Sequence, residues 1–425
     1  MDRTRDLASL AGEETIFGGF AAEKLKRLQA ELEPLSRRYD VVVANPPYMG
    51  SSNMNGWVSK WVKSNCPTAK SDLCTCFFER GQVLATAIGY ISMITASSWM
   101  FISSFEKFRK SLLSRGSICS MIQQSTHGYA GVTVPTTMFA YACSRSGVIG
   151  SYIRLEDFDR PQWQEPRALE ALANPDCGWF YRADAISYEA IPGSPIAYWI
   201  PISLKTAFEK GRPLEHYAPP KKGLGTGNKE LFMRCWWEVG LEKICFDARN
   251  GTEAQKSRKR WFPHNKGGEF RKWYGNDEYV VDWEHDGARI KSYRNETGQI
   301  ASYPRNQEKY FKPCVTWSKI SSGRLAFRYK PAGNIFNEVA PAFFSDKSFS
   351  FRLEAFLNSS VCAEVAKAIS PTLDFQVGQI ASYPILKGVL ENNRTSAIVE
   401  SLTENSHSDW DSFESSYDFK RHPLV

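Results

Sequence analysis

The sequence predicts an α/β protein in which part of a doubly wound, Rossmann-like sheet is followed by a region of mixed α+β structure. Up to about residue 143, short apolar runs alternate with segments of helical periodicity, the pattern of parallel strands joined by crossover helices. Beyond Ile149, prolines, tryptophans and short alternating segments replace this pattern. The 425 residues, 42% apolar and 13% aromatic, suffice for two to three folded domains and exclude a disordered chain. We expect a sheet domain over residues 1–150, a second domain over residues 151–395 and a C-terminal tail over residues 396–425.

The first domain is expected to contain the C-terminal half of such a sheet. Its expected helices span residues 21–35, 71–89 and 103–116, and its expected strands span residues 39–44, 90–95, 117–123 and 136–143. Leucines at helical spacing predict the first helix. Asp72 is a candidate N-cap of the second helix, and Ser103 with Glu106 forms a candidate capping box for the third. No helical segment separates the last two strands, so we expect them to pair as a hairpin.

One charge-free stretch, Gly81–Phe105, is long enough to cross a bilayer. It contains eight Gln, Ser and Thr residues and is interrupted by Gly89, so a buried helix followed by a buried strand explains it better than a membrane span. The N-terminus has acidic residues where a signal peptide would be apolar, and the ten cysteines include no CxxC pair. We therefore expect a reduced, cytoplasmic protein without a metal site or a membrane contact.

The positive charge of the chain is concentrated in one region. Residues 221–330 contain 23 Lys and Arg against 13 Asp and Glu, a net charge of +10, whereas the whole chain carries +7. A local excess of this size is typical of a surface that binds a polyanion. A solvated basic surface without a ligand is the alternative.

The sequence Asn45-Pro46-Pro47-Tyr48 directly follows the expected strand over residues 39–44. Sheets of this class bind ligands at the carboxyl ends of their strands, and two successive prolines give a rigid loop rich in hydrogen-bond acceptors. An exocyclic amine on an aromatic base is a poor nucleophile because its lone pair is conjugated with the ring. The Asn45 side-chain oxygen and the Pro46 carbonyl can each accept one of its N–H groups and localise that pair, while Tyr48 can stack on the ring. The loop therefore predicts chemistry at the amino group of a base.

This loop and its surroundings resemble the amino-group DNA methyltransferases, in which an [NDS]PP[YFW] loop after a sheet strand is the catalytic motif. A proline-rich turn is the structural alternative. The sequences that follow the motif in that family are similar to three segments of this chain, namely Lys70–Leu73, Phe77–Gly81 and Gly89–Met93. The resemblance implies that the loop Asn45–Tyr48 is catalytic and acts on N6 of adenine. It also implies that Tyr129, in the loop before the last strand, lies against the flipped base.

The resemblance covers roughly residues 39 to 390. Lys222–Asn228 and Trp236–Val239 are similar to the opening of the target-recognition region in the PglX family of bacteriophage-exclusion (BREX) methyltransferases and in related restriction–modification enzymes. It implies double-stranded DNA as partner and S-adenosylmethionine as cofactor, with other phage-exclusion proteins as further candidate partners. Contacts to DNA, mostly to phosphates, are expected from Lys229, Arg234, Arg258, Lys259, Arg260, Arg271 and Lys272.

The cofactor glycines, which that family carries on a strand before the catalytic loop, have no counterpart here. Only 38 residues precede Tyr39, too few for three strands and their crossover helices, and Phe17–Phe20 lacks the expected glycine spacing. Gly223–Gly227 is an alternative cofactor turn, although the prolines and lysines before it disfavour a buried strand. We therefore expect a truncated or split enzyme, inactive and unable to bind S-adenosylmethionine until an N-terminal part or partner chain completes it. Two alternatives remain open: a DNA-recognition fragment without activity, and part of a fused restriction–modification enzyme with its nuclease elsewhere.

Overall fold

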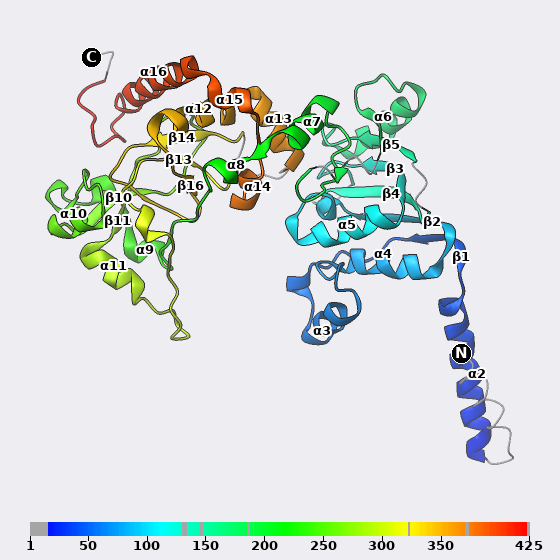
Figure 1. The fold of residues 1–425 in the computed structure, drawn as a ribbon. Helices are drawn as coiled ribbons and strands as arrows, with labels where there is room; N and C mark the ends of the chain where they lie inside the picture. Colours follow the sequence, from blue (N-terminus) through cyan, green and yellow to red (C-terminus); the bar gives the residue numbers. More distant parts are fainter. Residues whose placement is uncertain are drawn as a thin grey trace. The chain divides into compact units, whose positions relative to one another are not determined.

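The computed structural model describes residues 16–129, 134–144, 148–184, 188–189, 191–321, 324–369 and 374–422. The chain forms two compact units, which Figure 1 shows as a ribbon. The first unit ends at Glu189 and also includes Gly193–Trp199, and the second contains the chain from Ile200 onward. This division falls later than the expected boundary at residue 150, because two further strands extend the first sheet beyond that point.

The first unit is built on a six-stranded sheet with the strand order β1-β2-β4-β3-β5-β6. The strands span Tyr39–Ala44 (β1), Ala85–Ala96 (β2), Ser117–Gln123 (β3), Thr136–Ala142 (β4), Ile149–Arg154 (β5) and Phe180–Asp184 (β6). Pairing is parallel between β1 and β2 and between β3 and β5, whereas β4 is antiparallel to both β2 and β3. The predicted hairpin of the last two expected strands is therefore confirmed, and the mixed α/β fold class is confirmed with it.

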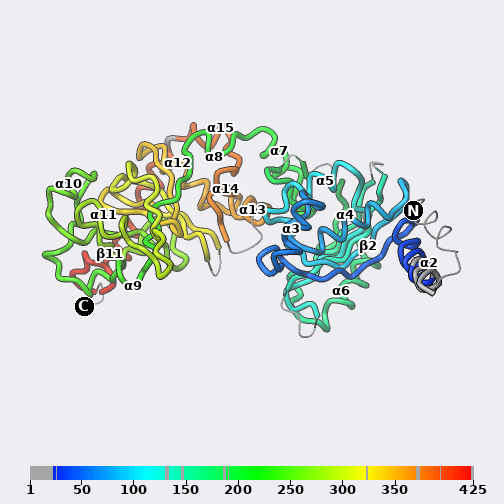
Figure 2. Tube along the Cα trace, turned by 90° about the horizontal axis from the view of Figure 1, so that it is seen from below, coloured from blue at the N-terminus to red at the C-terminus, as the bar shows by residue number. Residues whose placement is uncertain are grey.

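The helices of the first unit span Ile16–Ser36 (α2), Gly56–Asn65 (α3), Leu73–Leu84 (α4), Glu106–Arg115 (α5) and Pro161–Ala173 (α6). α4 and α5 cover one face of the sheet and α6 covers the other, whereas α2 precedes β1. Successive strand residues point to opposite faces, and Met121 accordingly packs in the core below α4 and α5, whereas Ile122 packs in the cluster beside α6. Figure 2 likewise shows α4 and α5 on one side of the sheet and α6 on the other.

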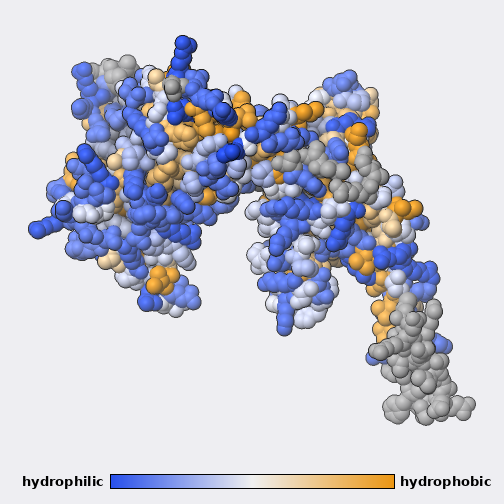
Figure 3. Space-filling model, viewed as in Figure 1, coloured by the Kyte–Doolittle hydropathy of each residue, from blue (hydrophilic) through white to orange (hydrophobic). Residues whose placement is uncertain are grey.

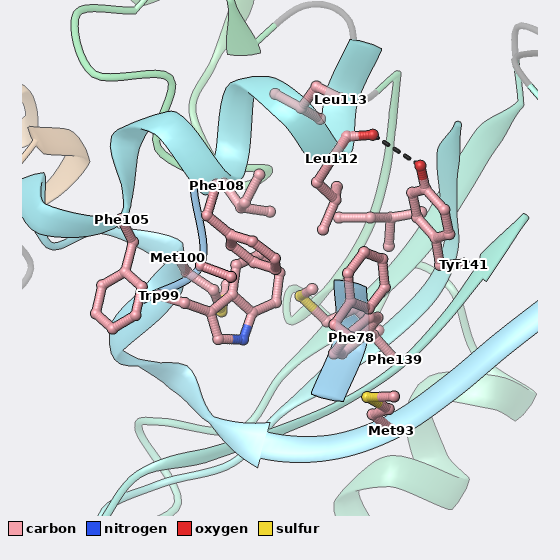
Figure 4. Packing of buried hydrophobic residues seen from close by; sticks show 14 of the residues in the cluster. Phe78, Met93, Trp99, Met100, Phe105, Phe108, Leu112, Leu113, Phe139 and Tyr141 are labelled. Carbon is pink, nitrogen blue, oxygen red and sulfur yellow. Dashed lines mark hydrogen bonds between the residues drawn. The ribbon is translucent and has the colours of Figure 1, made fainter. Parts of the chain in front are cut away.

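The main core of the first unit is aromatic. The ring centroid of Phe78 in α4 lies 5.5 Å from that of Phe108 in α5 and 5.1 Å from that of Tyr141 in β4, and both pairs have edge-to-face geometry (Figure 4). The Tyr141 hydroxyl donates a hydrogen bond of 2.8 Å to the Leu112 carbonyl, so the buried phenol has a partner. These contacts hold α4 and α5 against the strands that carry the site described below.

Two expected details of the first unit were wrong. The helix expected to run to Gly89 ends at Leu84, because the residues from Ala85 onward pair in β2. The capping box at Ser103 is absent: Ser103–Phe105 is a 3-10 turn, and α5 begins at Glu106 without a side-chain cap. The expected helix over residues 21–35 is confirmed as part of α2, although its leucines at 28, 32 and 35 are exposed.

The second unit combines small sheets with short helices. Its strands are β7 (Arg212–Pro213), β8 (Leu224–Gly225), β9 (Met233–Cys235), β10 (Trp261–Asn265), β11 (Tyr279–Asp282), β12 (Tyr303–Pro304), β13 (Cys314–Trp317), β14 (Phe327–Lys330), β15 (Ile335–Phe336), β16 (Ala342–Phe343) and β17 (Pro384–Ile385). Its helices are α7 (Ile202–Lys210), α8 (Leu214–Tyr217), α9 (Lys229–Phe232), α10 (Gly251–Lys256), α11 (Glu284–Lys291), α12 (Lys347–Leu357), α13 (Ser360–Ile369), α14 (Val377–Ala381), α15 (Lys387–Glu391) and α16 (Asn393–Trp410). Four strands form the largest sheet, in the order β15-β10-β11-β9. Half of the expected C-terminal tail, residues 396–410, lies in α16, which packs against α12.

Within the described residues, no helix has the length and apolar character needed to cross a membrane. The charge-free stretch Gly81–Phe105 forms instead the end of α4, all of β2 and the turns that lead to α5. All ten cysteines are free thiols.

Candidate active site

The loop Asn45–Tyr48 lies at the carboxyl end of β1, as its position in the sequence predicts. β1 and β2 run parallel, with Ala44 opposite Met93, so β2 ends at the same edge of the sheet. β4 runs the other way and begins at this edge, where Thr136 pairs with Ala96. The sheet therefore gathers one loop and two strand ends around a single position.

A cavity of about 740 Å³ opens at this position. It is lined by Asn45, Pro46, Pro47, Tyr48, Ile94, Tyr129 and Thr136. The structure thus brings all five predicted residues of the target-base site to one cavity, although Tyr129 is 81 positions from Tyr48 in the sequence. Its volume lies within the range of small-ligand pockets, and aromatic and apolar walls with one amide suit a flat base that carries an amino group.

The two tyrosines are partly open to solvent. Tyr48 is 38% exposed and Tyr129 is 39% exposed. Burial raises the pKa of Tyr48, and the neighbouring Cys74 and Tyr129 raise it further. The Tyr48 ring therefore stays uncharged at neutral pH and presents an apolar surface with a hydroxyl donor, which is the form that stacks on a base.

Asp72 connects the end of the loop to the start of α4. Its Oδ1 accepts hydrogen bonds from the backbone N–H of Met49 at 3.2 Å and of Cys74 at 2.9 Å, and it serves as the N-cap of α4, as predicted. The Leu73 N–H donates to the Met49 carbonyl at 3.0 Å. Because Asp72 is buried, this connection holds the residue after Tyr48 in place.

The segment that carries Tyr129 is held from both sides. Thr136 Oγ1 donates to Gln124 Oε1 at 2.7 Å, and the Gln124 N–H donates to the Thr136 carbonyl at 2.9 Å. Further along, both the backbone N–H and Nδ1 of His127 bond to the Asp159 carboxylate, at 3.1 and 2.9 Å. These hydrogen bonds lower the pKa of Asp159. The Tyr129 segment is thus anchored two residues before the tyrosine.

Four of the seven predicted DNA-contacting residues lie together in the second unit. Arg234, Arg258, Lys259 and Arg260 line one hollow of about 480 Å³, with Lys243. Arg258 is exposed, but Lys259 donates to the Glu242 carbonyl and Arg234 donates to the carbonyl of Met233 at 2.6 Å. Three glutamates share the hollow, so its charge is mixed.

Arg260 is committed to an internal ion pair. It bonds through Nε and a terminal nitrogen to Asp282, at 3.1 and 2.9 Å, and Arg289 bonds to the same carboxylate oxygen. Asp282 is buried, and a buried carboxylate needs such partners. This observation favours a structural role for Arg260 over a role in binding phosphate.

The other three predicted residues lie outside this hollow. Lys229 is exposed at the start of α9. Arg271 pairs with Asp409 at 2.9 Å and lies over the Trp410 ring, and Lys272 donates to the Asn358 carbonyl at 2.7 Å. Arg271 and Lys272 therefore hold α16 and the end of α12 in the second unit.

The glycines of the segment 223–227 are explained by close backbone packing. A Cβ on Gly223 would lie 2.0 Å from the Phe336 carbonyl oxygen, and Gly227 has φ = +74° beside the Ala301 backbone. Leu224 and Gly225 form β8, paired with β12. A two-residue strand in an antiparallel pair differs from the parallel strand and glycine turn that a cofactor site of this class uses.

Three contributors to the site were not identified from the sequence. Ile94 and Thr136 line the cavity, and Asp72 was identified only as a helix cap. The signals were weak: Thr136 begins an expected strand, and Ile94 lies near the end of another. The link from Asp72 to Met49 spans 23 residues and has no signature in the sequence.

Comparisons with known proteins agree with this geometry. Residues 16–128 match the model of the Eco57I restriction-modification methylase family. Over 410 residues, the chain is 38% identical to the adenine-specific methyltransferase PglX of Lacticaseibacillus casei (strain Zhang), a match that covers 95% of this chain and 34% of that protein. It is 33% identical to the adenine-specific methyltransferase BrxX of Escherichia coli O9:H4 (strain HS), covering 94% of this chain and 32% of that protein.

A solved structure of the Type IIL restriction-modification enzyme MmeI in complex with DNA aligns with 90% of this chain and 52% of that one, at a TM-score of 0.54 and 12% identity. The fold is therefore shared with that enzyme. The chain spans about a third of the length of the two curated relatives. The predicted resemblance to PglX-type adenine-specific methyltransferases is confirmed along nearly the whole of this chain.

Proposed function

We propose that this chain is the part of an adenine-specific DNA methyltransferase that holds the target adenine and recognises DNA. The methyl donor would be S-adenosylmethionine and the acceptor N6 of adenine in double-stranded DNA, within a phage-defence or restriction–modification system. The observation that carries this proposal is the Asn45–Tyr48 loop at the carboxyl end of β1, facing one cavity with Tyr129. A DNA substrate implies that the protein acts in the cytoplasm.

The loop would act by orienting the amine. Asn45 Oδ1 and the Pro46 carbonyl accept one N–H each, which favours a pyramidal nitrogen whose lone pair points away from both acceptors. Tyr48 and Tyr129 bind the faces or edge of the base and offset the few kcal/mol that extrusion from the duplex costs. Positioning of this kind contributes much of the rate in reactions without a covalent intermediate.

The cofactor contributes the electrophilic methyl group. We propose no cofactor-binding role for any described residue of this chain. The glycines at 223–227 do not fit, because neighbouring backbone occupies the space beside them. We propose that the remaining length of the protein, in the same polypeptide or in a partner chain, supplies that site. The second unit would contact DNA, with Arg258 and Lys229 as the exposed residues among the seven predicted contacts.

The experiment measures methyl transfer by the full-length protein, with any partner chain, from isotope-labelled S-adenosylmethionine to unmethylated duplex DNA, and the product base is identified by mass spectrometry. Asn45→Ala removes the acceptor and should lower kcat at least a hundredfold, while DNA affinity changes less than threefold. Asn45→Asp keeps an acceptor oxygen and serves as the matched control, which should retain more activity than Asn45→Ala. Near wild-type methylation by Asn45→Ala would refute the assignment.

A further inference from the structure

α3 presents two tryptophans to solvent shortly after the candidate catalytic loop. Trp57 is 75% exposed and Trp61 is 49% exposed. They are four positions apart, so they lie on the same face of the helix. Tryptophan is rarely so exposed, and two neighbouring examples indicate a surface that binds something.

The fold of α3 does not require these side chains. Its inner face is formed by Val62, which is buried in the core of the first unit, and by Val58, which packs against that core. Met54, just before the helix, is buried in the same cluster, and Asn55 caps the helix by accepting from the Val58 N–H at 2.9 Å. α3 is therefore anchored through its inner face, and Trp57 and Trp61 remain available on the outer face.

The charge near these tryptophans is mostly positive, because Arg80 and Arg115 share a hollow with Trp61 against one acidic residue there, Glu79. Residues 41–71 contain no acidic residue and three lysines, two of which, Lys60 and Lys63, are exposed on α3. Neither forms a salt bridge with any residue that the structure describes. Figure 3 shows the surface at α3 mostly in pale and blue colours, and Trp61 also lines a hollow of about 720 Å³ with Leu73, Phe77 and Val83. Exposed aromatic rings beside unpaired lysines are the combination that binds unstacked nucleotides.

The position of α3 is compatible with the same stretch of DNA as the candidate active site. Trp57 follows Tyr48 by nine residues, which limits their separation to about 30 Å even for an extended chain. Hydrogen bonds bring the connecting segment back to α4, because Ser51 N–H donates to the Ser71 carbonyl at 2.9 Å. One turn of B-DNA rises about 34 Å, so Trp57 and the loop that faces the cavity lie within one turn of a duplex of each other.

We propose that the outer face of α3 is a second DNA-binding surface, on which Trp57 and Trp61 stack against unstacked bases of the DNA that is bound at the active site while Lys60 and Lys63 contact phosphates. This inference rests on the proposed function. It assigns DNA binding to the unit that carries the catalytic loop, in addition to the basic second unit.

The test uses fluorescence anisotropy with a labelled 30-base-pair duplex that contains one unpaired adenine. Trp57→Ala combined with Trp61→Ala should weaken binding at least tenfold, since each lost base stack costs about that much. Replacement of both residues by Phe keeps the rings and should restore most of the affinity. Trp163→Ala is the matched control, because Trp163 is 46% exposed on α6 of the same unit, and it should leave affinity within twofold.

The lysines are tested through salt dependence. Lys60→Gln with Lys63→Gln should reduce the slope of log affinity against log salt concentration by about 2, because two fewer phosphates are neutralised. The proposal is overturned if the wild-type protein does not bind this duplex. It is also overturned if the double Ala variant binds the duplex with unchanged affinity, even when that variant no longer binds a protein partner. Asn45→Ala separates the two hypotheses: methylation that survives Asn45→Ala refutes the catalytic assignment, whereas the α3 variants report on DNA affinity alone.

Discussion

Replacing Asp72 tests whether the catalytic loop depends on its connection to α4. Asp72→Ala removes the acceptor for both the Met49 and the Cys74 N–H groups. Loss of the N-cap costs about 1 kcal/mol, and loss of the second hydrogen bond, at a partly exposed loop, costs about 1 kcal/mol more. We therefore expect the free energy of unfolding of the first unit to fall by about 2 kcal/mol, a decrease in Tm of roughly 4–8 °C.

The effect of Asp72→Ala on catalysis should exceed its effect on stability. A loop displaced by about 1 Å can lose about a hundredfold in rate, so kcat should fall by roughly that factor at a temperature where the variant is folded, while KM for DNA changes little. Asp72→Asn keeps the accepting Oδ1 and should retain most of kcat. Asp346→Ala removes the comparable N-cap of α12 in the second unit and should lower stability without a change in kcat. Equal kcat for wild type and Asp72→Ala, or equal loss in Asp72→Ala and Asp72→Asn, would refute this reasoning.

Three further outcomes are expected. Burial lowers the pKa of His264 to about 4 from its ordinary 6.5, so between these values the folded state keeps His264 neutral while the unfolded chain takes up a proton. The contribution of His264 to the free energy of unfolding should be fully present above about pH 6.5 and fall by up to about 3 kcal/mol toward pH 4. Urea unfolding of His264→Gln should show a weaker dependence of this free energy on pH. Tyr129→Ala should reduce the change in fluorescence that protein binding causes in a 2-aminopurine placed at the target position of the DNA, without altering Tm by more than about 1 °C. An unchanged fluorescence signal would show that Tyr129 does not contact the target base. Arg258→Gln should weaken DNA binding, measured by fluorescence anisotropy, and leave Tm unchanged. Arg260→Gln should lower Tm in thermal unfolding, because the buried Asp282 loses a partner. The opposite pattern would reverse the roles of the two arginines.

The parts of the fold that could be predicted from the sequence are those in which the signal is local. The apolar run Tyr39–Ala44 defines a strand, and the four residues after it must lie at the carboxyl end of that strand. The expected strand over residues 117–123 coincides with β3, because no competing pattern overlaps it. Tyr129 was placed at the same site by the family resemblance and not by a local signal, since it lies 81 positions from Tyr48.

Other features depend on contacts between residues far apart in the sequence. Helical periodicity shows that Leu28 and Leu32 share a face, but it does not show whether anything covers that face. A cluster of basic residues does not reveal that Arg260 is paired with Asp282, 22 positions away, while Arg258 is exposed. The end of α4 was misplaced by about five residues, because pairing of Ala85 onward with β1 overrides the helical spacing of Ile88.

The central claim is that Asn45 orients the amine of an adenine for methyl transfer, and it is tested most directly in the native host. The Asn45→Ala substitution is introduced at the chromosomal locus, so that the protein is made at its natural length and with its natural partners. N6-methyladenine in the genomic DNA is then quantified by mass spectrometry and mapped by single-molecule sequencing, with Asn45→Asp and wild-type strains alongside. We predict that one sequence motif is methylated in the wild type, is methylated less in Asn45→Asp and is unmethylated in Asn45→Ala. A motif that is fully methylated in the Asn45→Ala strain would contradict the account.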